Sequence, residues 1–330
     1  MATEFKQFDI ISINEFNSIS DHHYVSRSLS PSSTEAIMEE WRILEKDLPD
    51  SIFVRVYKGR VDLLRAVIIG PSGTPYHDGL FFFDIQVPSN YPALLEYVLA
   101  SPPKVFSWND DRSKKRNPPQ STILQVLVSI QGLVLNGEPF INFPGFESFA
   151  NSSSWFKKRS VHENVFIKNC KTMVSILKKP PQSFEKFVSQ HFRHRASTIL
   201  VAFNAYINGQ AEIGDPITVT AATEITASLA SFTFKAEAGF VYPRLVDSFI
   251  KNGSSVESIE LLDTSKTIRE YTVHEHRNCQ LVVLMIFILV FYSTILVKKS
   301  HGAGGLLYSL FGLDIFLLLL LIPSLHFEFN

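Results

Sequence analysis

The chain has 330 residues, of which 45% are hydrophobic, and its formal net charge is −1. This length leaves room for one or two domains. A nearly neutral chain lacks the positive charge that drives nucleic-acid binding, so no nucleic acid is expected among its partners. Its two cysteines, Cys170 and Cys279, lie too far apart in sequence to form a disulfide framework, which favours a reducing, cytoplasmic location.

The first predicted elements are a flexible lead-in and a helix. Residues 1–32 are polar and rich in serine, and the adjacent His22 and His23 are expected to be solvated there. A helix is predicted over 33–48, because Ser32 and Glu35 have the capping-box spacing and apolar residues recur at helical intervals. The apolar face comprises Ile37, Trp41, Leu44 and Leu48.

Three strands are predicted next, over 52–57, 63–69 and 80–87. Short turns between consecutive strands favour an antiparallel meander. The third strand is rich in phenylalanine and lies between two turns rich in glycine and proline. Such a strand is typical of the middle of a sheet that is covered on at least one face.

A further helix is predicted over 121–136, capped by Ser121. Its apolar residues recur at helical spacing, so we expect this helix to pack across the strand at 80–87. They are Ile123, Leu127, Ile130 and Val134. Residues 210–279 are harder to interpret and are predicted to be partly helical, with a helix over 240–250.

The C-terminal segment 280–325 is an apolar tail with one or two candidate transmembrane segments. Residues 280–297 carry no charge and are about long enough to cross a bilayer, and residues 306–325 form a second, interrupted candidate. A buried core helix and the translation of noncoding sequence in a wrongly joined reading frame are the alternatives. Just before the tail, His274, His276 and Cys279 supply only three possible zinc ligands, so no metal site is expected.

Several sequence words, in this order, carry a resemblance to a known family. They are 79–83, Tyr91-Pro92, Pro102-Pro103, 138–142, 144–147 and 179–181. Their order resembles the ubiquitin-conjugating (E2) family, and in detail the large E2 subfamily of the plant phosphate-regulating and E2–E3 hybrid type. The resemblance covers about residues 35–209 and implies a domain at 33–209. The implied α+β fold has an N-terminal helix, a four-stranded antiparallel sheet and C-terminal helices, with 102–106 as the fourth strand after an unusually long loop at 93–101.

The resemblance implies ubiquitin transfer to protein lysines. The implied partners are ubiquitin, the ubiquitin-activating enzyme and a ubiquitin ligase or substrate protein, with the membrane added by the tail. Only the upstream activating enzyme would use ATP, so no cofactor is expected. Arg42, Lys46, Pro102 and Pro103 are the candidate partner-binding residues, although an ordinary solvated helix face explains Arg42 and Lys46 equally well.

The resemblance fails where the family carries its chemistry. The family's acceptor cysteine and its oxyanion-stabilising asparagine would stand between Phe106 and Ser121, but that stretch has no thiol and no matching turn. We therefore assign no catalytic residue and expect an inactive pseudoenzyme, because Cys170 fits an apolar helix position better than a relocated nucleophile. A non-catalytic E2-variant binding module and a membrane-anchored E2-like protein are the alternatives.

Overall fold

The computed structural model describes residues 5–12, 19–26, 34–87, 91, 96–99, 122–139, 155–215 and 230–256. All of them lie in the first of two compact units, Met1–Thr264 and Ser265–Asn330. Both candidate membrane segments, 280–297 and 306–325, are outside the described residues. None of the helices in the described ranges combines the length and the apolar character needed to cross a bilayer.

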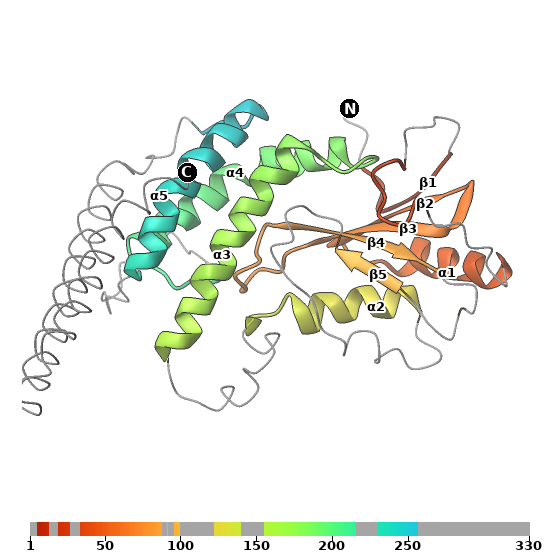
Figure 1. Cartoon of the computed structure of the whole chain (residues 1–330), viewed down its shortest axis with the longest axis horizontal. Coiled ribbons are helices and arrows are strands. Elements are labelled where there is room, and N and C mark those ends of the chain that lie inside the picture. Colours follow the sequence, from red (N-terminus) through yellow and green to blue (C-terminus); the bar gives the residue numbers. More distant parts are fainter. Residues whose placement is uncertain are drawn as a thin grey trace, which may run out of the picture. The chain divides into compact units, whose positions relative to one another are not determined.

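The described chain forms one five-stranded sheet, whose strands lie side by side in sequence order (Figure 1). The strands are β1 (Phe8–Ile11), β2 (Ile52–Tyr57), β3 (Arg60–Ile69), β4 (Leu80–Gln86) and β5 (Glu96–Leu99). Strands β2 to β5 pair antiparallel, but β1 pairs parallel with β2. The prediction of a four-stranded antiparallel sheet is therefore wrong. The sheet is mixed because a helix connects β1 to β2, and a long crossover of this kind permits parallel pairing.

The last strand of the sheet is displaced from its predicted position. Residues 93–101 were expected to form a loop, yet β5 lies within them and pairs with β4, with Phe83 opposite Leu99. The local sequence explains the difference, because Tyr97 and Val98 favour extended structure. The predicted fourth strand at 102–106 lies outside the described residues.

Two short helices cover one face of the sheet, where α1 (Thr34–Asp47) and α2 (Ile123–Ser129) lie in Figure 1. The predicted packing of α2 against β4 is confirmed, because Leu127 shares a hydrophobic core with Phe81 and Phe83. The helix is capped by Thr122 rather than by Ser121, with a capping box to Gln125. A π-helical segment, η2 (Ile130–Val134), continues it.

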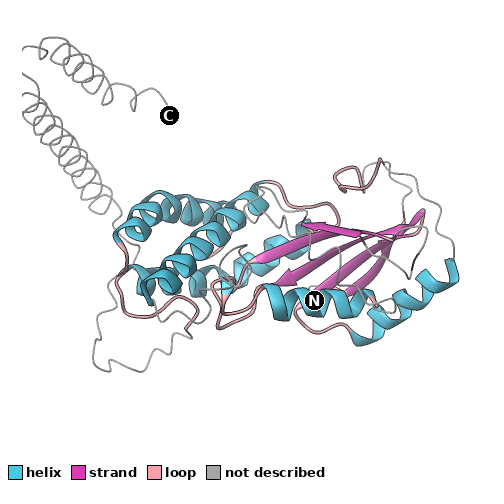
Figure 2. Cartoon of the chain, turned by 60° about the horizontal axis from the view of Figure 1, so that its bottom comes forward, coloured by secondary structure: helices cyan, strands magenta, loops and turns pink. Residues whose placement is uncertain are grey.

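Three longer helices follow, visible with the sheet in Figure 2: α3 (Trp155–Lys178), α4 (Glu185–Ile207) and α5 (Phe232–Lys251). They share a second hydrophobic core, to which the sheet contributes Val67, Leu80 and Phe82. Those three residues alternate with the ones that face α1 and α2, so the two cores lie on opposite faces of the sheet. Helix α5 lies in the segment for which partial helix was predicted.

The lead-in is not a flexible segment where the structure describes it. Besides β1, residues 19–26 form a turn-rich segment, called the strap from here on, whose Ile19 and Tyr24 pack with Tyr57 and Leu63 of the sheet. The expectation of a solvated His22 is wrong, because its side chain is buried. A polar, serine-rich composition does not reveal these contacts, since they form with strands more than thirty residues away in sequence.

Candidate functional site

Glu40 of α1 bonds one residue that precedes and one that follows the stretch of sequence where the family carries its nucleophile. Its side chain is buried, with Oε1 2.6 Å from the Tyr91 hydroxyl and Oε2 2.8 Å from the Ile123 backbone nitrogen. Tyr91 precedes this region in sequence and Ile123 is the first residue of α2. Burial, reinforced by the hydrogen bond to Glu40, raises the pKa of Tyr91, so this hydroxyl stays protonated and donates. One carboxylate thus ties Tyr91, which precedes the region in sequence, to the start of α2, which follows it.

Sequence analysis missed Glu40 because acidic side chains on amphipathic helices usually face solvent. A signal was present, since Glu40 lies on the predicted apolar face, between Ile37 and Leu44 and next to Trp41. A charged residue in the middle of an apolar stripe indicates a buried hydrogen-bonding role.

Removing this carboxylate should weaken the fold measurably. We expect Glu40→Ala to lower the free energy of unfolding by about 2–4 kcal/mol, because two buried donors lose their acceptor. Glu40→Gln should cost less, since one acceptor oxygen remains. Urea denaturation measures the change, and the neighbouring Glu39→Ala is the matched control, with an expected effect below about 0.5 kcal/mol. Equal effects of the two alanine variants would show that the Glu40 contacts contribute nothing.

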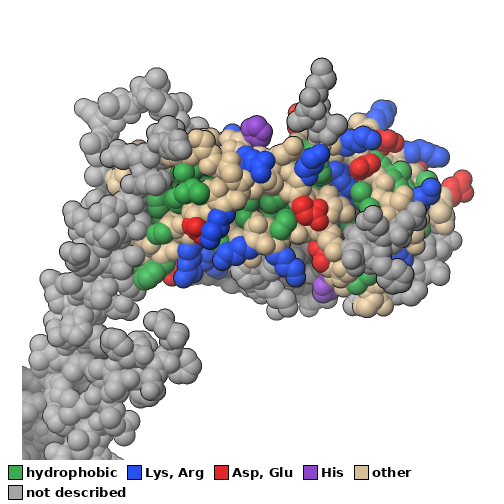
Figure 3. Space-filling model, turned by 90° about the horizontal axis from the view of Figure 1, so that it is seen from above, with side chains coloured by type: hydrophobic (Ala, Val, Ile, Leu, Met, Phe, Trp, Pro, Cys, Tyr) green, Lys and Arg blue, Asp and Glu red, His purple; other side chains and the backbone are tan. Residues whose placement is uncertain are grey.

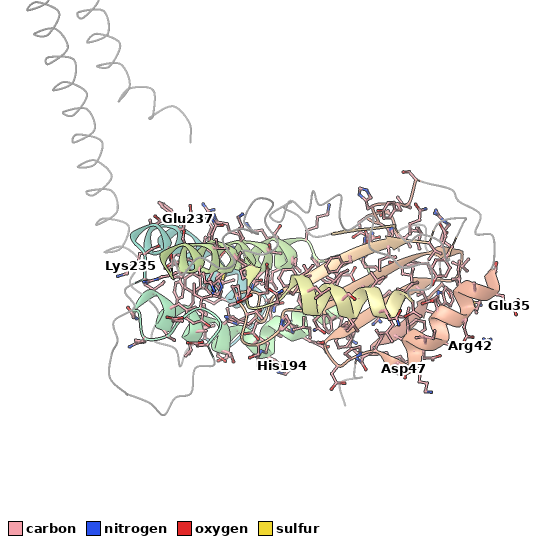
Figure 4. All side chains as sticks on the ribbon, turned by 90° about the horizontal axis from the view of Figure 1, so that it is seen from below. Glu35, Arg42, Asp47, His194, Lys235 and Glu237 are labelled. Atoms are coloured by element: carbon pink, nitrogen blue, oxygen red, sulfur yellow. The ribbon has the colours of Figure 1, made fainter. Side chains whose placement is uncertain are left out.

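The predicted partner-binding residues divide into two groups. Arg42 and Lys46 lie on the exposed side of α1, where Arg42 forms an ion pair with Glu39 of the same helix, at 2.6 Å. Figure 4 shows Arg42 pointing away from the sheet, between Glu35 and Asp47 of the same helix. Both basic residues are therefore accessible to a partner. Pro102 and Pro103 lie outside the described residues.

Cys170 is unsuited to nucleophilic chemistry where α3 places it. The side chain is fully buried, in the core shared by α3, α4 and α5, and burial raises the pKa of its thiol well above the usual value. A thiolate is the attacking species, so a buried thiol with a raised pKa is inert at neutral pH. Cys279 lies outside the described residues, as do His274 and His276.

A polar cluster that sequence analysis missed ties the turn before β4 to α4. The two oxygens of Asp78 bond different partners: Oδ2 lies 2.8 Å from His77 Nδ1 and Oδ1 lies 2.6 Å from Arg195 Nε. The Tyr206 hydroxyl lies 3.1 Å from His77 Nε2. Burial by itself raises the pKa of Asp78, but His77 and Arg195 outweigh it and hold the pKa below its usual range. All these groups are engaged with one another, so the cluster holds the turn in place.

The described residues contain no cluster of three or more histidine, cysteine, aspartate or glutamate side chains that could hold a metal ion. The candidate site thus comprises two features: the Glu40 carboxylate with its bonds to Tyr91 and Ile123, and the exposed face of α1.

Comparison with known proteins supplies the family. A family model described as "Ubiquitin-conjugating enzyme" matches residues 36–106. The chain is 40% identical to the probable ubiquitin-conjugating enzyme E2 25 of Arabidopsis thaliana over 299 residues, which is 83% of this chain but 48% of that relative, so it spans about half of that protein's length.

Two more relatives differ in how much of their own length this chain covers. The putative ubiquitin-conjugating enzyme E2 38 of Arabidopsis thaliana is 40% identical over 273 residues, which cover 76% of this chain and 82% of that relative. The human dual E2 ubiquitin-conjugating enzyme/E3 ubiquitin-protein ligase BIRC6 is 27% identical over 239 residues, or 62% of this chain and 5% of that protein. Because the chain covers 82% of E2 38 at 40% identity, it belongs to the ubiquitin-conjugating enzyme E2 family.

Proposed function

We propose that this chain is a non-catalytic E2-family protein that holds ubiquitin, or another protein of the ubiquitin pathway, without forming a thioester. One observation carries the proposal: the residues between Phe106 and Ser121 contain no cysteine, and the described Cys170 is buried in a helix core. Ubiquitin transfer through a thioester needs an accessible thiolate and a donor for the carbonyl oxyanion. A thiol without solvent access does not supply that thiolate.

Hydroxyl side chains do not replace the missing thiol. Ser107 and Ser113 stand in the same stretch of sequence, but a serine hydroxyl attacks a carbonyl only when a neighbouring base removes its proton. No histidine, the most frequent general base, occurs between Phe106 and Ser121.

The retained surfaces support a binding role. The exposed face of α1, with Arg42 and Lys46, would receive the ubiquitin-activating enzyme or a ligase. Lys and Arg side chains are interspersed with acidic and apolar ones on the face in Figure 3, and such a mixture suits a protein partner better than a polyanion. We further propose that the protein needs no cofactor of its own, and that it acts in the cytoplasm, at a membrane if 280–297 inserts.

The decisive assay is a ubiquitin-charging reaction. Incubation of the full chain with activating enzyme, ATP and ubiquitin should give no thiol-sensitive band one ubiquitin heavier on a non-reducing gel, because Phe106–Ser121 holds no cysteine and the described cysteine, Cys170, is buried. An E2 with an intact acceptor cysteine serves as the positive control for the reagents.

A thiol-sensitive conjugate that disappears in Cys170→Ala would overturn the proposal and make Cys170 a nucleophile. The proposed binding role is tested separately. The unlabelled chain is added to ¹⁵N-labelled ubiquitin and the changes in ubiquitin's amide chemical shifts are measured; binding to the activating enzyme is then measured in a second titration. If neither shows binding, and charging is also absent, the proposed binding role fails.

A further inference from the structure

His22 of the strap makes two hydrogen bonds that define its protonation state. Its Nε2 lies 3.0 Å from the carbonyl oxygen of Leu64, which can only accept, so Nε2 carries a proton. Its Nδ1 lies 3.2 Å from the backbone nitrogen of Tyr24, which donates, so Nδ1 carries none. The geometry therefore fits the neutral ring, with both nitrogens in use and the side chain fully buried.

A second proton on this ring would break the arrangement. It would bind at Nδ1 and place an N–H against the N–H of Tyr24, so that two donors face each other and Tyr24 loses this acceptor. Tyr24 is buried with Ile19 against Tyr57 and Leu63, and these contacts hold the strap on the sheet. Protonation of His22 thus opposes the contacts of its immediate neighbour.

The titratable groups around His22 come from three strands and from the strap itself. Asp84 of β4 lies 3.5 Å from Nε2, Arg65 of β3 binds both Asp84 and Asp21, and the Tyr57 ring of β2 meets the imidazole edge-on. The carboxylates favour the imidazolium form and Arg65 opposes it. Burial has the largest effect, and the pKa of His22 is lowered below its ordinary value.

We propose that the strap is a pH-sensitive cover of this sheet face, closed while His22 is neutral and released as the ring becomes protonated. The strap's other contacts with the sheet do not pass through the His22 ring: Arg65 binds Asp21, Asp84 accepts from the His23 backbone nitrogen, and Arg60 donates to the Val25 carbonyl. Release would expose the charged pair of Arg65 and Asp84 beneath the strap.

The sign of the pH effect follows from the lowered pKa. The closed strap has its full stability above the ordinary histidine pKa, where the ring is neutral both in the closed and in the open state. Stability is lost as the pH falls below that value toward the pKa of the closed state, because only the open state then takes up the proton readily. The strap should therefore open on mild acidification.

Hydrogen exchange of the Tyr24 amide on the full chain tests this directly. Between pH 7.5 and 5.5, its protection factor, corrected for the intrinsic pH dependence of exchange, should fall about three- to tenfold, the upper limit set by an open-state pKa of about 6.5. Amides within β3 and β4 should keep their protection, because only the strap opens.

Two neighbouring variants separate the proposal from a general loss of stability. His22→Gln retains a donor for Leu64 but does not titrate, so the pH dependence should vanish. His23→Gln, at an exposed side chain, should leave it intact. If His22→Gln does not fold, the ¹⁵N shifts of His22 in the unmodified chain decide: titration at or above the ordinary pKa, or a proton on Nδ1 at neutral pH, overturns the proposal. Protection of Tyr24 that does not change with pH overturns it as well.

Discussion

Leu127→Asp is expected to lower the free energy of unfolding by about 4 kcal/mol or more. Leu127 is fully buried, and it packs in the core that α1 and α2 share with the sheet. The substitution removes an apolar side chain and places a carboxyl group in an apolar core that cannot solvate it. Natural domains are stable by only about 5–15 kcal/mol, so the variant should be largely unfolded at physiological temperature.

The next residue along the helix provides the control. Val128 is 43% exposed, so Val128→Asp keeps its carboxylate in water and should cost less than about 1 kcal/mol. Chemical denaturation of both variants, followed by circular dichroism, measures the difference. If the two variants were equally stable, α2 would not pack on the sheet through Leu127.

Asp84→Ala should destabilise the fold by about 3–5 kcal/mol. The Arg65 guanidinium lies beneath the strap with its side chain 1% exposed, and Asp84 binds it through both oxygens, at 2.6 Å and 2.9 Å. Asp84 also accepts from the backbone nitrogen of His23, at 2.7 Å. Removing this carboxylate leaves a buried cation whose one remaining ionic partner among the described residues is Asp21, and an undercompensated buried charge is costly.

A double-mutant cycle distinguishes this loss from a simple cavity. Arg65→Met combined with Asp84→Ala removes both charges, and it should be more stable than the sum of the single effects predicts. Asp247→Ala, which breaks an exposed pair with Lys251, should change stability by less than about 1 kcal/mol. Additive effects of the Arg65 and Asp84 substitutions would show that the pair is not coupled.

The sequence by itself determined the elements with strong periodicity. The apolar spacing of Ile37, Trp41 and Leu44 located α1, because burial along a surface helix repeats with the helical turn. The continuous phenylalanine-rich run at 80–87 between two turns located β4, which is buried along its whole length. The order of the sequence words indicated the E2 family. The lack of a thiol between Phe106 and Ser121 is likewise a property of the sequence alone.

Only the tertiary structure decided which partners the buried polar residues contact. Arg55, Arg65 and Asp84 lie in one row across β2, β3 and β4, because the strand register sets them opposite one another. Strand alternation places each of them on a face, but it does not give the register or reveal that the strap covers that face. Glu40 and His22 are buried by partners more than forty residues away along the chain. Such contacts depend on how the whole chain folds back on itself, and local composition does not encode them.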